Sequence, residues 1–127
     1  MTEEAQRWVR KAEADLRMAR HDLQTSPDPN LDGICFHCQQ AAEKMLKALL
    51  VERAVAFPRT HDLALLARLI VPADPALCAL QADLVRLSRF AVAFRYPGSE
   101  ATSEDASQSI DIAEQVSAAV RPLLPVN

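Results

Sequence analysis

Glycine and aromatic residues are scarce in this sequence, which has two glycines, one Trp, one Tyr and four Phe among 127 residues. β-Sheets favour aromatic residues and tight hairpins favour glycine, so these scarcities argue against an all-β fold. No apolar run approaches the roughly 20 residues of a membrane-spanning helix, so no membrane partner is expected. The acidic beginning, Met1 to Glu4, lacks the basic and apolar regions of a signal peptide.

An excess of basic charge is also missing, because the formal net charge is −3. That balance argues against a general affinity for the nucleic-acid backbone and leaves open a local basic patch. The three cysteines do not indicate a disulfide framework, which predicts a cytoplasmic location. No glycine-rich phosphate loop, Ser-His-Asp arrangement or HExxH motif occurs, so no cofactor is predicted.

The sequence does contain clear helical periodicity. Its length fits one domain spanning residues 1–127. Prolines and caps separate the periodic segments. Thr60 is expected to cap the short helix that carries Leu63, Leu66 and Leu69, and Thr102 or Ser103 the last one. The longer helices are expected at residues 3–24, 31–54, 76–94 and from 103 onwards. The pattern predicts an all-α fold, an antiparallel up-and-down four-helix bundle with one additional short helix.

The segment from residue 34 to residue 50 has two faces at 100° per residue. One is an apolar seam that contains Cys35 and Cys38. A metal or redox role for these cysteines is the weaker interpretation, because zinc needs about two more nearby ligands and buried free cysteines are common in cores. No metal site is therefore predicted.

The opposite face of this segment carries a polar stripe formed by His37, Gln40, Lys44 and Lys47. Three interpretations stay open. The stripe is a solvated face with a Glu43–Lys47 pair, a protein interface flanked by Phe36 and Val51, or a site for an anionic ligand.

Arg95 lies 18 residues after Leu77 and returns to the same helical angle if the helix continues that far. A guanidinium at the end of a buried seam needs a partner or a ligand. Two alternatives follow. Arg95 forms an ion pair with one of three carboxylates, or it belongs to a nucleotide or polyanion site in which Tyr96 stacks on a base. The carboxylates are Asp15, Asp62 and Asp105. A catalytic pair in which Asp62 orients His61 as a base is the less favoured interpretation of these two residues, because neighbours at a helix start rarely face each other.

The order of several motifs resembles that of the HEPN domain (higher eukaryotes and prokaryotes nucleotide-binding). The resemblance covers nearly the whole chain and rests on these residues: Trp8, Ala12, Asp15, Leu16, Ala19, the run from Cys35 to Leu50, Thr60 to Leu63, Arg95 to Gly98, and Asp105 with Ala106. It implies a helical bundle, usually dimeric, that is often encoded beside a minimal nucleotidyltransferase in a toxin–antitoxin-like pair. Many members are ribonucleases with an Arg followed a few residues later by His.

This chain departs from that ribonuclease pattern, because its last histidine is His61 and none follows Arg95. The resemblance therefore implies a protein that binds a nucleotide or RNA, and the candidate binding residues are Arg95, Tyr96, Lys44, Lys47, His37 and His61. The residues expected at a homodimer contact are Phe36, Gln40 and Val51. Two alternatives remain: a divergent metal-independent ribonuclease that uses Arg95, Tyr96 or His61, and a purely structural dimerisation domain.

Overall fold

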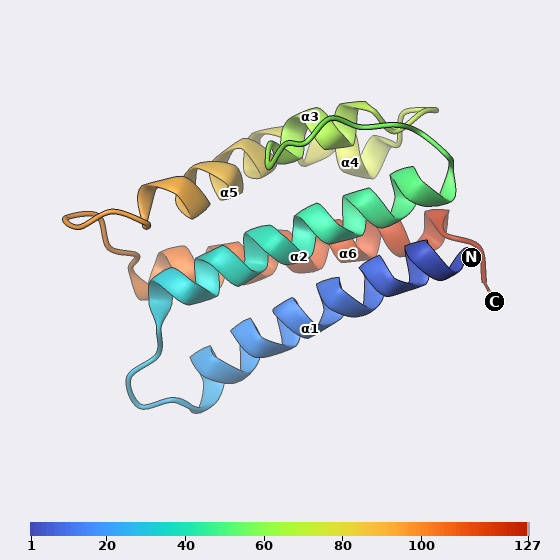
Figure 1. Cartoon of the computed structure of the whole chain (residues 1–127). Helices are drawn as coiled ribbons and strands as arrows, with labels where there is room; N and C mark the ends of the chain where they lie inside the picture. Colours follow the sequence, from blue (N-terminus) through green and yellow to red (C-terminus); the bar gives the residue numbers. More distant parts are fainter. Residues whose placement is uncertain (127) are drawn as a thin grey trace.

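The computed structural model describes residues 1–126 and contains only helices among them (Figure 1). Helix α2 is central, with α1 on one side of it and α3, α4 and α5 on the other, while α6 packs against α2. None of these helices combines the length and apolar character that crossing a bilayer requires. The elements are α1 (Glu3–Thr25), α2 (Leu31–Glu52), α3 (Leu63–Arg68), α4 (Pro75–Ala79), α5 (Gln81–Ala93), α6 (Ser103–Val120) and the 3₁₀ turn η1 (Arg121–Leu123). The predicted all-α bundle is confirmed.

Side-chain caps mark the start of α1, α2, α3, α4 and α6. The Thr102 hydroxyl accepts a hydrogen bond from the Asp105 N–H, and the Asp105 carboxylate accepts one from the Thr102 N–H, which is a complete capping box. The prediction that Thr60 caps α3 is wrong. Asp62 is the cap, because its carboxylate accepts from the Leu65 N–H at 3.1 Å. The Thr60 hydroxyl instead accepts from the Asp62 N–H in the preceding turn.

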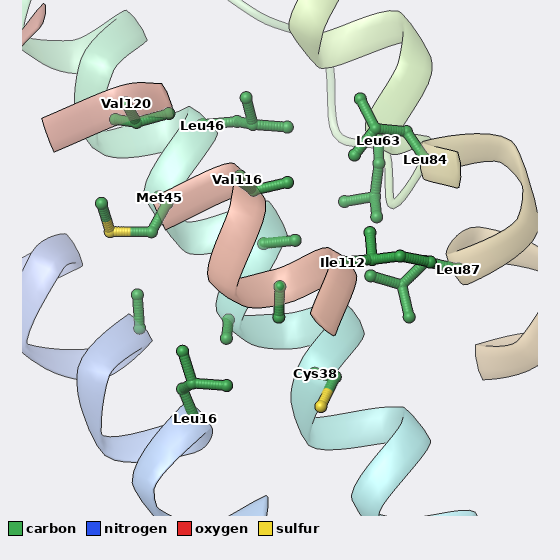
Figure 2. Packing of buried hydrophobic residues seen from close by; sticks show 14 of the residues in the cluster. Leu16, Cys38, Met45, Leu46, Leu63, Leu84, Leu87, Ile112, Val116 and Val120 are labelled. Atoms are coloured by element: carbon green, nitrogen blue, oxygen red, sulfur yellow. The ribbon is translucent and has the colours of Figure 1, made fainter. Parts of the chain in front are cut away.

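The core is one cluster of mainly leucine, isoleucine, valine, alanine and cysteine side chains from all six α-helices (Figure 2). The predicted apolar seam of α2 is fully buried, as are Leu84 and Leu87 of α5. Figure 2 shows Leu84 and Leu87 beside Ile112 of α6. Small residues such as Ala12, which is 1% exposed, allow the helices to approach closely.

The predicted helix 76–94 is interrupted, because the chain forms α4 and α5 with a break at Leu80. Leu77 and Leu84 both remain buried on either side of this break, so the core is continuous although the helix is not. Helix α5 ends at Ala93, with Phe94 as its C-cap. Arg95 therefore does not continue a buried seam, and its side chain is exposed.

Helix α2 ends at Glu52, two residues earlier than predicted. Ala54 adopts the left-handed conformation with φ 55°. The Ala54 N–H donates to the Val51 carbonyl and the Val55 N–H to the Leu50 carbonyl, which is the Schellman pattern of a helix C-terminus. A left-handed residue cannot extend the helix, so the chain leaves α2 here.

Candidate anion-binding groove

A groove with a volume of about 760 Å³ lies between α2, α3 and α5. Its volume is in the range of small-molecule sites. We call it the arginine groove, because Arg68, Arg89 and Arg95 line it. Its remaining walls are mostly apolar, with a few polar side chains, and comprise Phe36, Gln39, Gln40, His61, Asp62, Ala64, Val85, Ser88, Ala91, Val92 and Ala93.

The three arginines come from different places in the chain. Arg68 ends α3, Arg89 lies on α5 and Arg95 follows α5. None of them forms an ion pair with a carboxylate of residues 1–126. The Arg95 guanidinium lies 5.7 Å from the centroid of the Phe36 ring, in a cation–π contact. The groove therefore presents three guanidiniums that form no ion pair within the described chain, and Asp62, which also lines it, caps α3.

One wall of the groove is a stripe on α5 formed by Val85, Ser88, Arg89 and Val92, at helical spacings of three and four. Val85 is 38% exposed and Val92 is 60% exposed, although both are apolar. The Ser88 hydroxyl accepts a hydrogen bond from the Leu63 N–H and so joins α5 to the start of α3. An exposed apolar stripe beside an unpaired guanidinium suits a ligand with both an apolar ring and an anionic group.

A buried carboxylate holds His61 at the edge of the groove. The His61 Nδ1 atom lies 2.8 Å from Glu43 Oε1, and the Lys47 ammonium donates to the other Glu43 oxygen at 3.0 Å. The Gln39 side-chain amide donates to Glu43 Oε1 and to the His61 carbonyl oxygen, both at 3.1 Å. The Glu43 side chain is 5% exposed and that of His61 is 78% exposed. The network therefore fixes an imidazole that is itself open to the groove.

The protonation state of Glu43 follows from these contacts. Burial alone raises the pKa of this carboxyl, but hydrogen bonds from His61, Lys47 and Gln39 outweigh burial and hold the pKa below its ordinary value. The carboxylate is thus ionised near neutral pH and accepts the proton of His61 Nδ1–H. The other ring nitrogen, Nε2, is left unprotonated in the neutral imidazole.

Much of the predicted polar stripe lies away from the groove. His37 and Lys44 both contact Asp15 of α1, with 2.9 Å between His37 Nδ1 and the carboxylate. Lys47 lies 5.7 Å from the ring centroid of Trp8 and 5.6 Å from that of Phe57, and its side chain is 12% exposed. The predicted Glu43–Lys47 pair is present. These three basic side chains tie α1 and the loop after α2 to α2.

The structure brings together some of the predicted site residues and separates others. His61, Arg95, Phe36 and Gln40 all line the groove. Those outside it are His37, Lys44, Lys47, Val51 and Tyr96, and Tyr96 is 66% exposed.

The prediction that an ion pair closes a buried seam at Arg95 is wrong, since each proposed carboxylate is engaged elsewhere. Asp15 binds His37 and Lys44, Asp62 caps α3, and Asp105 belongs to the capping box of α6.

Sequence reasoning missed Arg68, Arg89 and the contact between Glu43 and His61. A signal for Arg89 was present, because Val85 and Val92 share its helical stripe and lie off the seam of Leu84 and Leu87. His61 and Asp62 do not orient each other, and Glu43 takes the role of orienting His61.

Cys35 and Cys38 are both buried free thiols, and burial raises the pKa of each above its ordinary value. Thiols of this kind are poor nucleophiles and poor metal ligands. In the described part of the chain, no three His, Cys, Asp or Glu side chains gather as a metal site.

Comparison with known proteins identifies the family. The HEPN domain model matches residues 5–123, so the chain belongs to the HEPN domain family. No curated protein matches the sequence significantly.

Two solved structures are similar to this chain. TT1696 from Thermus thermophilus has a TM-score of 0.82 and 23% sequence identity, over 97% of this chain and 100% of that one. The second is ST0689, an archaeal HEPN homologue, with a TM-score of 0.73 and 23% identity over 94% and 96% of the two chains. At this level of identity, the similarity supports a shared fold.

Proposed function

We propose that this HEPN domain protein binds a nucleotide or RNA through the arginine groove. The observation that carries the proposal is the set of three unpaired guanidiniums around one groove of about 760 Å³. Guanidinium groups match phosphate oxygens with paired hydrogen bonds. Phe36 and the valines of α5 offer apolar surface to a base. The Gln40 side-chain amide donates to Gln39 Oε1 at 2.8 Å and keeps its own oxygen and its second N–H for the edge of the base.

Calorimetric titration with ATP and with a short RNA tests the proposal. The Arg95→Gln variant should bind either ligand about tenfold to hundredfold more weakly, the value of one or two lost hydrogen bonds to a charged group. Arg86→Gln is the matched control, because Arg86 is an exposed arginine of α5 that lies 3.9 Å from Asp83 and outside the groove. Absence of binding to both ligands would count against the proposal.

We also propose that the protein forms a homodimer and pairs with a minimal nucleotidyltransferase, as HEPN domain proteins commonly do. Two of the residues expected at a dimer contact, Phe36 and Gln40, line the arginine groove. A contact through this face would place the groove of a second chain alongside the first.

Phe36→Asp should then dissociate the dimer in light scattering while the helical content measured by circular dichroism is retained. A monomeric wild-type protein would contradict the dimer. The same titrations in the presence of the nucleotidyltransferase test whether the pair, and not the HEPN protein alone, binds the ligand.

A second candidate function is metal-independent cleavage of RNA, and the Glu43–His61 contact favours it. In this proposal His61 Nε2 takes the proton of a ribose 2′-hydroxyl, and the resulting oxygen attacks the adjacent phosphorus. The bond to the 5′-oxygen breaks, that oxygen takes a proton from water, and a 2′,3′-cyclic phosphate remains. Arg95 stabilises the negative charge on the phosphoryl oxygens.

This second candidate makes a separate prediction about variants. Purified protein should cleave RNA, and His61→Gln and Arg95→Gln should each remove the cleavage. Cleavage that persists in both variants would show that another site, or a contaminant, is responsible. RNA binding without cleavage leaves the first candidate intact and eliminates the second.

A further inference from the structure

A second positively charged surface lies on α1, on the opposite side of α2 from the arginine groove (Figure 1). We call it the α1 basic band and define it as Arg7, Arg10, Lys11 and Arg17, all of which are exposed. Spacings of three, four and seven residues put them on one face of the helix, away from the buried positions. At about 1.5 Å per residue, the band extends roughly 15 Å along the helix axis.

The band has acidic neighbours on the same helix, but its four side chains are not paired with them. None of its four side chains forms an ion pair with an acidic group of residues 1–126. Glu13 of the same helix lies 3.6 Å from Arg121, and Asp15 points to α2, where it binds His37 and Lys44. Glu3 and Glu4 precede Arg7 by four and three positions and share its face, and neither forms an ion pair with it. Four basic side chains thus gather on one face of a chain with a net charge of −3.

A second cavity adjoins the band. Its volume is about 320 Å³, and it lies between α1, α2 and α6. Leu16, Met45 and Ala113 contribute apolar surface to it, and its charged lining residues are Glu13, Arg17, Arg20 and Arg121. Arg20 is paired with Glu114 at 2.9 Å, whereas Arg17 has no acidic partner in the described chain. Arg17 therefore belongs to both the band and the cavity.

We propose that the α1 basic band binds the phosphate backbone of single-stranded nucleic acid and that the adjoining cavity receives one unstacked base. A line of unpaired basic side chains matches a row of phosphates, and arginine is the side chain that binds them with paired hydrogen bonds. A single strand is favoured over a duplex, because only an unstacked base can leave the backbone and enter a cavity beside it. The inference does not depend on the arginine groove, since the two surfaces share no residue.

Fluorescence anisotropy with a labelled single-stranded RNA tests the proposal. Arg10→Gln combined with Arg17→Gln removes two phosphate contacts. The slope of log affinity against log salt should then become shallower by about 1.4, at roughly 0.7 per contact with a single strand. Arg86→Gln on α5 is the control and should leave the slope unchanged. ATP binding measured by calorimetry should be the same in the double variant as in the wild type, because the groove is intact.

An unchanged RNA affinity and salt slope in the double variant would overturn the proposal, and so would a wild-type protein that does not bind the strand. An acidic protein as the natural partner of the band would give that same unchanged result. Photo-cross-linking of a strand containing 5-iodouridine gives an independent measurement. Cross-links on peptides from α1 and α6 are expected, and cross-links confined to α5 would contradict the assignment. If Arg89→Gln loses ATP binding while the Arg10 and Arg17 substitutions still change the salt slope of RNA binding, then the groove and the band are independent sites.

Discussion

Replacing Glu43 by Gln removes the one charge that three neighbouring side chains contact. The Glu43 side chain is 5% exposed, and its partner Lys47 is 12% exposed, so the substitution leaves a mostly buried ammonium without its carboxylate. Breaking a buried pair in this way typically costs about 3–5 kcal/mol. His61 is 78% exposed, so water replaces its lost contact at little cost. The rings of Trp8 and Phe57 still face the ammonium. We therefore expect a loss of about 2–4 kcal/mol in the free energy of unfolding.

The loss should depend on pH, because the folded state lowers the pKa of Glu43 from its ordinary value of 4.5. A lowered pKa means that the carboxylate contributes its full stability above the unfolded-state pKa. That contribution is lost as the pH falls through the folded-state pKa. The difference between the wild type and Glu43→Gln should thus be constant near neutral pH and shrink below about pH 4.5.

Urea unfolding followed by circular dichroism, repeated at several pH values, measures this difference. A difference that stays the same from neutral pH to about pH 3 would refute the assignment of an ionised, hydrogen-bonded Glu43. A difference below about 1 kcal/mol at neutral pH would also refute it.

Three further substitutions test the packing and the backbone. Leu84→Ala should lower the free energy of unfolding by about 2–5 kcal/mol in the same urea assay, because Leu84 is fully buried. A smaller loss would mean that the core collapses around the site. Ala54→Gly should raise the free energy of unfolding by roughly 0.5–1 kcal/mol, since glycine adopts the left-handed conformation without strain. A loss of stability would contradict the Schellman turn. Asp15→Asn should destabilise the contact between α1 and α2 by about 1–3 kcal/mol, because His37 and Lys44 both bind that carboxylate. Amide hydrogen exchange measures the effect, and in this variant it should be faster in α1 than in α5.

The helical architecture was accessible from the sequence because it follows from local patterns. The α2 seam was visible as a period of three and four, and the start of α6 as a choice of Thr102 or Ser103, of which Thr102 is the cap. Both depend on residues a few positions apart. Errors at helix ends, such as Thr60 in place of Asp62, arose because two residues close together can each cap a helix.

The position of Arg95 could not be predicted, because it depends on where a helix breaks. The spacing between Leu77 and Arg95 implies a shared face only along a straight helix. The break at Leu80 and the end of α5 at Ala93 remove that relation. No proline or glycine marks the break at residue 80, so the sequence carries no strong local signal for it.

The groove could be predicted only in part, because its residues come from separate helices. His61 and Arg95 stood out as single residues, but the contact between Glu43 and His61 spans 18 positions and two elements. Glu43 instead suggested an ordinary pair with Lys47, four positions away, and that pair is also present. Contacts within one helix are encoded in its period, whereas contacts between helices require the packing itself.

The central claim, that the arginine groove binds the phosphate groups of a nucleotide, is tested most directly by titrating ATP into Arg89→Gln and Arg86→Gln side by side. The two arginines lie three positions apart on α5, and only Arg89 lines the groove. The account predicts that Arg86→Gln binds ATP as the wild type does and that Arg89→Gln binds it about tenfold to hundredfold more weakly. Equal affinities in the two variants would contradict it.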